Sequence, residues 1–452
     1  KQDINNDQDF LKDDELQNFK TIENKLETLL GQQQNIQREN EVNINEALNA
    51  AIHKSGPVHI NIPFDEPLYE TVDQLSVKSK VIEYDLKSKQ IDGFLINELA
   101  ESWSSATKKM VIVGVNMPNT IEQKWLNTLA KDDSVIVFTE TTSNLYHSEF
   151  FPSIDKIIAP LSEEEFEALQ PDILLTIGGL IVSKKIKACL RKHKPKHHWH
   201  IDEYKANDTF FSLEHFIKIS PNQFFTSFFK EVTQGIKSDY HEFWTAVKNH
   251  RQKKHTIYLK DIPFSDLTVF DKVLASIPND SILQLSNSST VRYTQLFNLN
   301  KTLKVYCNRG TSGIDGSTST AIGCSVINKK QTVFITGDLS FFYDSNALWN
   351  NYIPNNFRII IINNKGGGIF RILPGDKNSE NFDTFFETKH QLSAKHLSKM
   401  YGFDYNTASN EAELEIELQS FYKENKTPKI LEVFTPRTLN DSVLLNYFKA
   451  IK

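Results

Sequence analysis

Two segments of the sequence place oxygen-bearing side chains directly after runs of apolar residues. Asp338 follows TVFITG, and Asn364 follows RIIIIN after a gap of 25 residues. Carboxylate and amide oxygens are suitable ligands for Mg²⁺, which in proteins also binds the phosphate oxygens of bound molecules. Gly366 is the natural source of a backbone carbonyl, because a run of three glycines lets the chain approach closely. The pattern predicts a magnesium site that holds a phosphorylated ligand.

Further groups at the same strand end can receive phosphate oxygens. Ser340 offers a hydroxyl, and a helix that begins after Asp338 presents free amides and the positive end of its dipole. An alternative interpretation is that the Gly-Asp and Asn-Asn pairs are only turn residues. That interpretation stays open for each pair alone, but two pairs at this spacing favour the metal site.

The elements that must position these residues follow an α/β pattern. Short apolar strands alternate with helical stretches from about residue 92 onward, which indicates parallel sheets with crossover helices. The expected strands are KMVIVGV, SVIVFTE, DILLTIGG and HHWHID in residues 92–236, and SILQLS, TLKVYCN, TVFITGD, RIIIIN and KILEVFTP in residues 237–452. Four consecutive isoleucines at 359–362 predict a central strand buried on both faces. Since ligands bind at the carboxyl ends of such strands, the site belongs to residues 237–452.

Other segments carry weaker structural signals. NEVNINEALNAAIHK predicts a helix, and the alternation of Val58, Ile60 and Ile62 predicts a strand over residues 57–64. SEEEFEAL predicts a helix start whose acidic residues face the positive end of the dipole.

Two segments contain histidines that could act in catalysis or bind a metal, but we favour a structural interpretation for both. A helix is expected across residues 384–403, with His390 and His396 at its surface. The segment HKPKHHWH resembles a metal cluster, but no acidic or cysteine residue stands at a zinc-type spacing. We expect a solvated strand entry there, with His198 and His200 on one face.

The overall composition excludes several classes of protein. The 452 residues carry a net charge of −6, which argues against nucleic acid or an anionic membrane as the main partner. Three cysteines without a CxxC pair suit a reducing compartment. The sequence contains no apolar run of about 18 residues, the length that would predict a membrane span. It also does not open with a secretory signal. A cytoplasmic protein is expected.

Several longer motifs carry a family resemblance. Asp338 and Asn364 at this spacing resemble the thiamine diphosphate motif of decarboxylase-like enzymes, although Leu339 stands where that motif has a second glycine. NRGTSGIDG, GDLSFFYDSNALW, NNKGGGIFRILP and GPVHINIPFDEPLY together resemble the menaquinone-pathway family of 2-succinyl-5-enolpyruvyl-6-hydroxy-3-cyclohexene-1-carboxylate synthases. The motifs cover residues 237–452 and the segment at 57–64, whereas the middle of the chain matches only in type.

The resemblance implies an α/β enzyme of the thiamine diphosphate-binding fold with a Rossmann-like central domain. It implies decarboxylation of 2-oxoglutarate on thiamine diphosphate and addition of the succinyl unit to isochorismate. It also implies that Asp338, Asn364 and the Gly366 carbonyl hold Mg²⁺ or Mn²⁺ on the diphosphate, with Ile314 as an apolar wedge under the cofactor. The other implied cofactor contacts are Asn287, Gly337, Leu339 and Ser340.

Both of these substrates carry carboxylates, which a guanidinium binds through two parallel hydrogen bonds. Arg292 and Arg309 are the candidates, and both are expected on loops at strand ends beside the metal site. A surface charge is the alternative for each arginine alone. Ser288 is expected to add a hydroxyl, and Ile369 and Phe370 an apolar wall against the isochorismate ring.

The resemblance further implies four parts of the chain. They are a remnant of the pyrimidine-binding domain (1–64), a linker (65–91), the central domain (92–236) and the diphosphate-binding domain (237–452). The activating glutamate of this family is expected upstream of Lys1, in a longer enzyme that is a homodimer or homotetramer, so the chain alone is expected to be inactive. Two other interpretations stay open: a non-catalytic subunit, and another thiamine diphosphate carboligase of the acetolactate synthase type.

Overall fold

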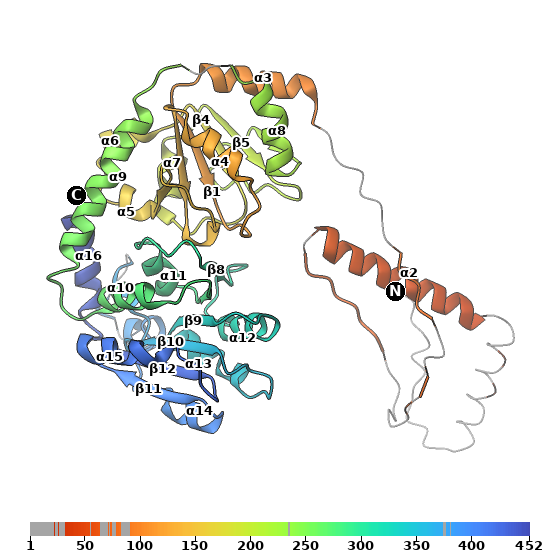
Figure 1. The fold of residues 1–452 in the computed structure, drawn as a ribbon, viewed down its shortest axis with the longest axis vertical. Helices are drawn as coiled ribbons and strands as arrows, with labels where there is room; N and C mark the ends of the chain where they lie inside the picture. Colours follow the sequence, from red (N-terminus) through yellow and green to blue (C-terminus); the bar gives the residue numbers. More distant parts are fainter. Residues whose placement is uncertain are drawn as a thin grey trace. The chain divides into compact units, whose positions relative to one another are not determined.

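The protein is described here by a computed structural model, shown in Figure 1. The structure describes residues 22, 26, 32–54, 56–63, 71, 73–74, 78–82, 91–233, 236–373, 377–379 and 381–452. The chain divides into two compact units, residues 1–89 and 90–452. Most of the expected linker, residues 65–91, lies outside the described residues.

The first unit contains helix α2 (Gln32–Lys54), which confirms the helix predicted from its sequence. The side chain of Asn45 accepts from the Ile82 amide at 2.7 Å, and that of Asn49 donates to the Ile82 carbonyl at 2.6 Å. Residues 56–63 form no strand and are largely exposed, so the strand predicted over residues 57–64 is wrong for its described part. A strand needs a neighbour to receive its hydrogen bonds, and no strand occurs among the described residues of this unit.

The second unit begins with a six-stranded sheet in which every pair of neighbours is parallel. The order is β3-β2-β1-β4-β5-β6. Its strands are β1 (Lys109–Val113), β2 (Val135–Thr139), β3 (Phe151–Pro152), β4 (Ile173–Ile177), β5 (His197–Ile201) and β6 (His215–Ile217). The four strands predicted here are confirmed, whereas β3 and β6 are too short to leave a pattern in the sequence.

Two layers of helices cover this sheet. One core joins Val111 and Val113 to α3 (Gly93–Ser105), α4 (Gln123–Ala130) and α8 (Pro221–Glu231). The other core joins Met110 and Ile112 to α5 (Ile154–Ile158), α7 (Lys184–Lys192) and α9 (Tyr240–Tyr258). Successive residues of β1 therefore point into the two cores in turn, as in a strand that is buried on both faces. Helix α6 (Glu163–Leu169) starts at a capping box on Ser162, as SEEEFEAL predicts.

The second sheet is also six-stranded and parallel, with the order β11-β12-β10-β9-β7-β8. Its strands are β7 (Ile282–Leu285), β8 (Lys304–Cys307), β9 (Thr332–Gly337), β10 (Phe357–Asn363), β11 (Asp404–Ala408) and β12 (Lys429–Phe434). All five predicted strands are confirmed. Every residue of β10 is buried, because the isoleucine strand lies between β9 and β12.

The helices of this half pack around the second sheet (Figure 1). They are α10 (Asp266–Ser276), α11 (Ser289–Thr294), α12 (Ser317–Ile327), α13 (Asp338–Tyr343), α14 (Lys395–Met400), α15 (Glu411–Phe421) and α16 (Asn440–Ala450). Shorter turns are η2 (Ser345–Leu348), η3 (Gly368–Arg371) and the π-helical η4 (Phe382–Phe386), and η1 (Thr141–Ser143) lies in the first half.

The helix predicted across residues 384–403 is wrong for residues 387–394, which are not helical. Backbone groups of this segment bond elsewhere, so they are not available for a helical ladder. The amide of Ala394 donates to the Glu432 carboxylate at 3.0 Å, and the Glu387 carbonyl accepts from the Gly367 amide. The segment therefore passes the glycine loop that follows β10 without forming a helix.

Candidate functional site

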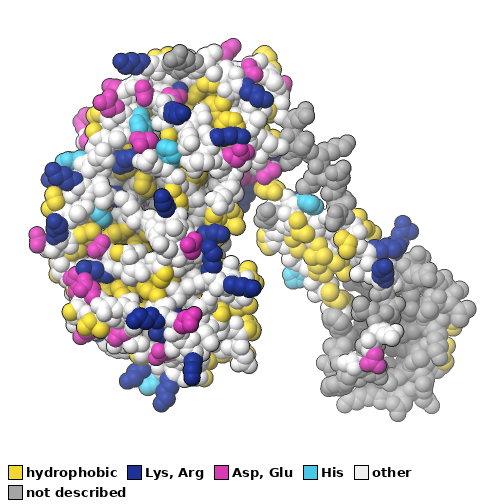
Figure 2. All heavy atoms as spheres, viewed as in Figure 1, with side chains coloured by type: hydrophobic (Ala, Val, Ile, Leu, Met, Phe, Trp, Pro, Cys, Tyr) yellow, Lys and Arg dark blue, Asp and Glu magenta, His cyan; other side chains and the backbone are white. Residues whose placement is uncertain are grey.

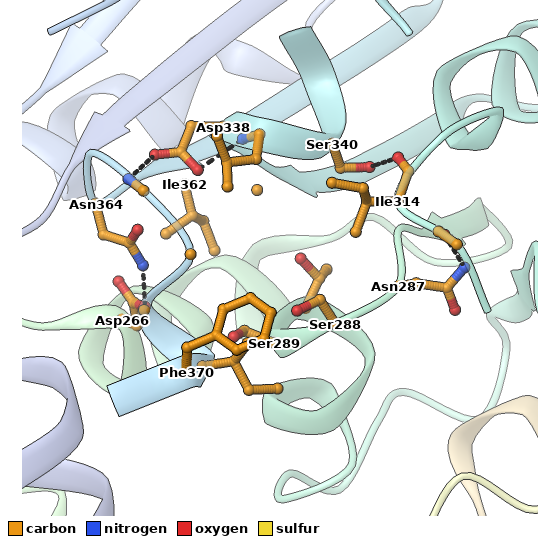
Figure 3. A pocket seen from close by; sticks show the side chains of 18 of the residues that line it. Asp266, Asn287, Ser288, Ser289, Ile314, Asp338, Ser340, Ile362, Asn364 and Phe370 are labelled. Carbon is orange, nitrogen blue, oxygen red and sulfur yellow. Dashed lines mark hydrogen bonds between the residues drawn. The ribbon is translucent and has the colours of Figure 1, made fainter. Parts of the chain in front are cut away.

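A cavity of about 340 Å³ opens where β7, β9 and β10 end (Figure 3). Eleven residues of its wall are site residues proposed from the sequence: Asn287, Ser288, Ile314, Gly337, Asp338, Leu339, Ser340, Asn364, Gly366, Ile369 and Phe370. They come from four separate loops, which the parallel sheet brings to one edge. Two of the proposed residues, Arg292 and Arg309, are not part of this wall.

Asp338 is the first residue of α13 and is 3% exposed. One carboxylate oxygen accepts from the Leu339 amide at 2.7 Å, and the other accepts from the Gly366 amide at 3.0 Å. The second oxygen also lies 3.2 Å from Nε2 of His390. These donors fix the direction of the carboxylate. His390 was predicted to be a surface residue, and that prediction is wrong, because its side chain is only 10% exposed and faces Asp338.

Asn364 supplies the other predicted side-chain oxygen. Its amide nitrogen donates to Asp266 Oδ2 at 3.0 Å. Its oxygen, Oδ1, is buried and has no hydrogen-bond partner among the described residues. A buried acceptor without a donor is unusual in a folded protein. It fits a site where a cation is the missing partner.

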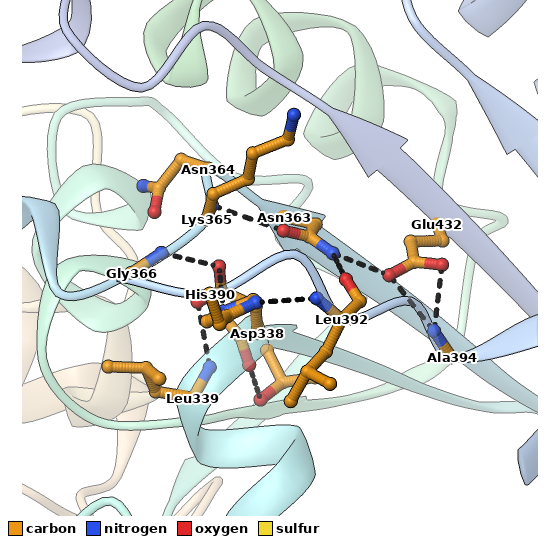
Figure 4. A network of polar contacts seen from close by, with 12 residues as sticks. Asp338, Leu339, Asn363, Asn364, Lys365, Gly366, His390, Leu392, Ala394 and Glu432 are labelled. Atoms are coloured by element: carbon orange, nitrogen blue, oxygen red, sulfur yellow. Dashed lines mark hydrogen bonds and ion pairs between the residues drawn. The ribbon is translucent and has the colours of Figure 1, made fainter. Parts of the chain in front are cut away.

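The preceding residue, Asn363, has a different task (Figure 4). Its amide nitrogen donates to Glu432 Oε1 at 2.7 Å and to the Leu392 carbonyl at 3.1 Å, and its oxygen accepts from the Lys365 amide at 3.1 Å. The backbone then turns sharply, with φ of +65° at Lys365 and +147° at Gly366. A Cβ at position 366 would lie 2.6 Å from the Glu387 carbonyl oxygen. Only glycine fits there.

Two further contacts shape the wall opposite this turn. Ser340 Oγ donates to the Ile314 carbonyl at 2.6 Å and so holds the loop that carries the proposed wedge. Asn287 donates to the carbonyls of Asn308 and Gly313 at 2.5 and 2.7 Å. Ser288 adopts a φ of +65°, which is uncommon outside glycine and turns the chain sharply into α11.

Ile369 and Phe370 lie on η3, after the glycine turn. Both are partly buried and line the cavity. The ring of Phe370 packs edge-on against Phe386 at a centroid distance of 5.8 Å. This packing gives the cavity an apolar side facing the polar strand ends (Figure 3).

Arg292 lies within α11 rather than on a loop, so the predicted loop position is wrong for this residue. Arg309 is on the loop after β8, and its Nη1 donates to Asn287 Oδ1 at 2.9 Å. Burial lowers the pKa of Arg292, an effect that Asp155 opposes and the like charge of Arg309 strengthens. The two guanidinium groups therefore act on each other.

Groups from the first half of the second unit interact electrostatically with these arginines: Glu140 after β2, Asp155 on α5 and Lys187 on α7. The Glu140 carboxylate accepts from the amides of Val182 and Ser183 at 2.7 and 2.8 Å, and burial raises its pKa to about 7. Burial lowers the pKa of Lys187, which also senses Glu140 and both arginines. The cluster thus joins residues from the elements around both sheets. Asn144 fixes that junction by pairing with the backbone of Val305 at 2.7 and 2.9 Å.

The histidine segment proves to be part of a buried strand. His198 and His200 are 1% and 8% exposed, so the predicted solvated strand entry is wrong. Thr176 Oγ1 lies 3.0 Å from His198 Nε2 and 2.8 Å from His200 Nδ1. The described residues include no cluster of three His, Cys, Asp or Glu side chains arranged to hold a metal ion. Burial lowers the pKa of His198 to about 4.

Sequence reasoning missed Asp266, His390 and Glu432, which hold the proposed metal ligands or their loop. Asp266 precedes Asn364 by 98 residues, and Glu432 follows Asn363 by 69. Nothing in the local sequence marks these residues, because each acts through a partner that only the fold brings near.

Comparison with known proteins gives the class first. Residues 287–433 match the C-terminal TPP-binding domain of thiamine pyrophosphate enzymes, and most residues of the cavity wall lie within that stretch. Among the described residues, no helix is long and apolar enough to cross a membrane.

The relatives give the family. The chain is 51% identical over 416 residues to the 2-succinyl-5-enolpyruvyl-6-hydroxy-3-cyclohexene-1-carboxylate synthase of Flavobacterium psychrophilum, covering 92% of this chain and 75% of that protein. It is 53% identical over 421 residues to the synthase of Christiangramia forsetii, covering 92% and 73%, and 36% identical over 420 residues to that of Porphyromonas gingivalis, covering 90% and 72%. The chain belongs to this synthase family, as its motifs predict.

Proposed function

We propose that the protein decarboxylates 2-oxoglutarate and adds the succinyl unit to isochorismate, giving 2-succinyl-5-enolpyruvyl-6-hydroxy-3-cyclohexene-1-carboxylate for menaquinone biosynthesis. Its membership of the synthase family supports the reaction. The observation that carries the site is the buried Oδ1 of Asn364, which has no hydrogen-bond partner in the part of the chain that the structure describes and lies with Asp338 and Gly366 at the cavity. These groups lie where an α/β sheet binds its ligands.

Asp338, Asn364 and the Gly366 carbonyl would hold Mg²⁺ or Mn²⁺, and the ion would bind the diphosphate of thiamine diphosphate. A carboxylate, an amide oxygen and a carbonyl are hard ligands of the kind these ions take. Thiamine diphosphate supplies the carbon centre on which a 2-oxo acid loses carbon dioxide. The protein's own residues bind and orient it.

Other wall residues are assigned to the cofactor by their positions. Ile314 presents an apolar side chain from a loop that Ser340 anchors, as a wedge under the cofactor requires. Gly337 and Leu339 flank Asp338 at the start of α13, where backbone amides point toward an anion. Asn287 holds the opposite loops together.

Substrate binding is assigned to the cation cluster and the apolar wall. Arg292 and Arg309, with Lys187, interact electrostatically with two buried acids among the described residues, Glu140 and Asp155. A bound carboxylate would relieve the repulsion between the two guanidinium groups. Ser288 adds a hydroxyl.

Ile369 and Phe370 form the apolar face against the ring of isochorismate. The arginine pair would give the site a cationic surface that binds carboxylates, and the Ile369–Phe370 pair would give it an apolar surface. Such a division suits a substrate that carries carboxylates on a hydrocarbon ring.

We also propose that the protein works as a homodimer or homotetramer. Apolar side chains at the ends of α12 and α13 and in the segment after η2 are strongly exposed: Ile327 (83%), Tyr343 (69%), Trp349 (71%) and Tyr352 (65%). We call this set the α12–η2 surface and assign it to a second copy of the chain, because α12, α13 and η2 pack against one another and neighbouring exposed apolar groups mark association sites. Hydrophobic side chains also reach the surface of the unit that contains α2 (Figure 2).

The reaction is tested with the protein from its complete reading frame, supplied with thiamine diphosphate and Mg²⁺. Incubation with 2-oxoglutarate and isochorismate should yield carbon dioxide and a product with the mass of the succinyl adduct. Pyruvate offered in place of 2-oxoglutarate should not react, because it lacks the second carboxylate. Preferential use of pyruvate would instead indicate a carboligase of the acetolactate synthase type.

A further inference from the structure

Asp266 is the first residue of α10 and lies at the wall of the cavity, 3% exposed. One carboxylate oxygen accepts from Asn364 Nδ2 at 3.0 Å, and the other accepts from Thr435 Oγ1 at 2.6 Å. Its backbone amide donates to Asn440 Oδ1 at 2.8 Å. Figure 3 shows the Asp266 side chain against the amide nitrogen of Asn364. Both carboxylate oxygens are thus already engaged by the protein.

An asparagine side chain has two ends of nearly equal size and opposite chemistry, an acceptor oxygen and a donor NH₂ group. An ionised carboxylate only accepts hydrogen bonds, so Asp266 requires the NH₂ end of Asn364 to face it. The oxygen end is then directed away from Asp266. This is the oxygen that is buried without a partner among the described residues.

We propose that Asp266 is a positioning residue that selects the orientation in which Asn364 presents its oxygen, and not its NH₂ group, to the divalent cation. The proposal rests on the metal site proposed above. We assign Asp266 no bond to the cation itself, since its two oxygens face Asn364 and Thr435. It acts on the cation only through Asn364.

The two side-chain ligands are therefore held in different ways. Asp338 has two equivalent oxygens, and backbone amides and His390 orient it. The side chain of Asn364 has one end that can bind a cation, the oxygen, and one that cannot, the NH₂ group. A turned amide would direct its hydrogens at the cation, so the site needs a partner that accepts from the NH₂ group. Outer-shell partners of this kind tune metal affinity.

The test measures Mn²⁺ binding at saturating thiamine diphosphate by electron paramagnetic resonance, with the thermal midpoint of each variant beside it. Asp266→Ala should weaken Mn²⁺ binding by about ten- to a hundredfold, the usual effect of losing an outer-shell partner. Asp266→Ser should do the same. Its hydroxyl keeps a polar group at the start of α10, but it is too short to reach Asn364, and it serves if the alanine variant does not fold.

The double variant Asp266→Asn/Asn364→Asp exchanges donor and acceptor. The amide at 266 can donate to the new carboxylate, whose second oxygen faces the cation. Mn²⁺ affinity should return to within about threefold of the parent protein, because the geometry of donor, acceptor and free oxygen is restored. A residue needed only for folding would not produce a loss and recovery of metal affinity at unchanged thermal midpoint.

Asp338→Ala separates the two proposals. If it leaves Mn²⁺ affinity unchanged, the metal site itself is misassigned. If it abolishes binding while Asp266→Ala and Asp266→Ser bind Mn²⁺ like the parent, only the role of Asp266 is overturned. A loss in these variants that the double variant does not recover also overturns it, since the carboxylate would then act in some other way.

Discussion

Nε2 of His390 lies 3.2 Å from Oδ2 of Asp338, although 52 residues separate them. The other ring nitrogen, Nδ1, accepts from the Leu392 amide at 3.1 Å. An acceptor at Nδ1 places the ring proton of a neutral imidazole on Nε2. His390 therefore donates to Asp338, whose carboxylate is oriented by three donors before any ligand binds.

The first prediction concerns that carboxylate. Asp338→Ala removes the anionic ligand of the proposed metal site and should lower the Mg²⁺-dependent affinity for thiamine diphosphate by roughly a hundredfold or more, at least the upper effect of losing an outer-shell partner. Isothermal titration with and without Mg²⁺ measures this. Asp280→Ala, at an exposed acid, is the control. Unchanged cofactor affinity in Asp338→Ala would reject Asp338 as a metal ligand.

The sequence was sufficient for the residues that carry their own signal. Asp338, Asn364 and Gly366 each follow a buried strand directly, so their place at the sheet edge could be predicted from strand pattern and turn chemistry. Asp266 and His390 could not be predicted in this way. Both lie far along the chain from the residues they hold, and each has an ordinary local context, a helix start for one and a loop for the other.

The second prediction concerns substrate recognition. Arg292→Ala should raise the KM for 2-oxoglutarate about ten- to a hundredfold, since a charge-assisted contact contributes about 1.5–3 kcal/mol. The thermal midpoint should change much less. Arg191→Ala is the matched control, because this arginine is exposed and lies over Phe211. Normal kinetics together with a large loss of stability would make Arg292 a structural residue.

Fold prediction succeeded where one chain segment decides the outcome and failed where a partner decides it. The isoleucine run at 359–362 predicted β10 because a strand buried on both faces needs apolar residues throughout. Residues 56–63 alternate as a strand does, yet no strand among the described residues bonds to them. Residues 387–394 lose their helix to bonds with Glu432 and the glycine loop. His198 is buried because Thr176 offers it a partner.

The third prediction concerns stability at low pH. Burial lowers the pKa of His198 to about 4, below the ordinary value of 6.5, so between these values the unfolded chain binds more protons than the folded one. The free energy of unfolding should therefore fall as pH decreases from 6.5 toward 4, by up to about 1.4 kcal/mol per pH unit for this proton. Urea unfolding at several pH values measures it.

His198→Gln should flatten this dependence, because its amide can meet Thr176 without titrating. His255 contributes to the remainder, since burial lowers its pKa to about 3. An equal slope in His198→Gln and the parent would show that His198 does not cause the loss of stability.

The last prediction concerns assembly through the α12–η2 surface. Ile327 and Trp349 are 83% and 71% exposed, and a second copy would remove both from water. Ile327→Asp places a carboxylate in that contact, where it would be buried without a partner. The dissociation constant of the subunits, measured by sedimentation equilibrium, should then rise at least about tenfold, equivalent to about 1.4 kcal/mol. Trp349→Ser should act in the same direction by removing apolar area.

Met117→Asp, at an apolar residue that is 60% exposed in the first half of the second unit, is the matched control and should leave the assembly unchanged. An assembly that is unaffected by Ile327→Asp and Trp349→Ser would place the contact between copies on another face.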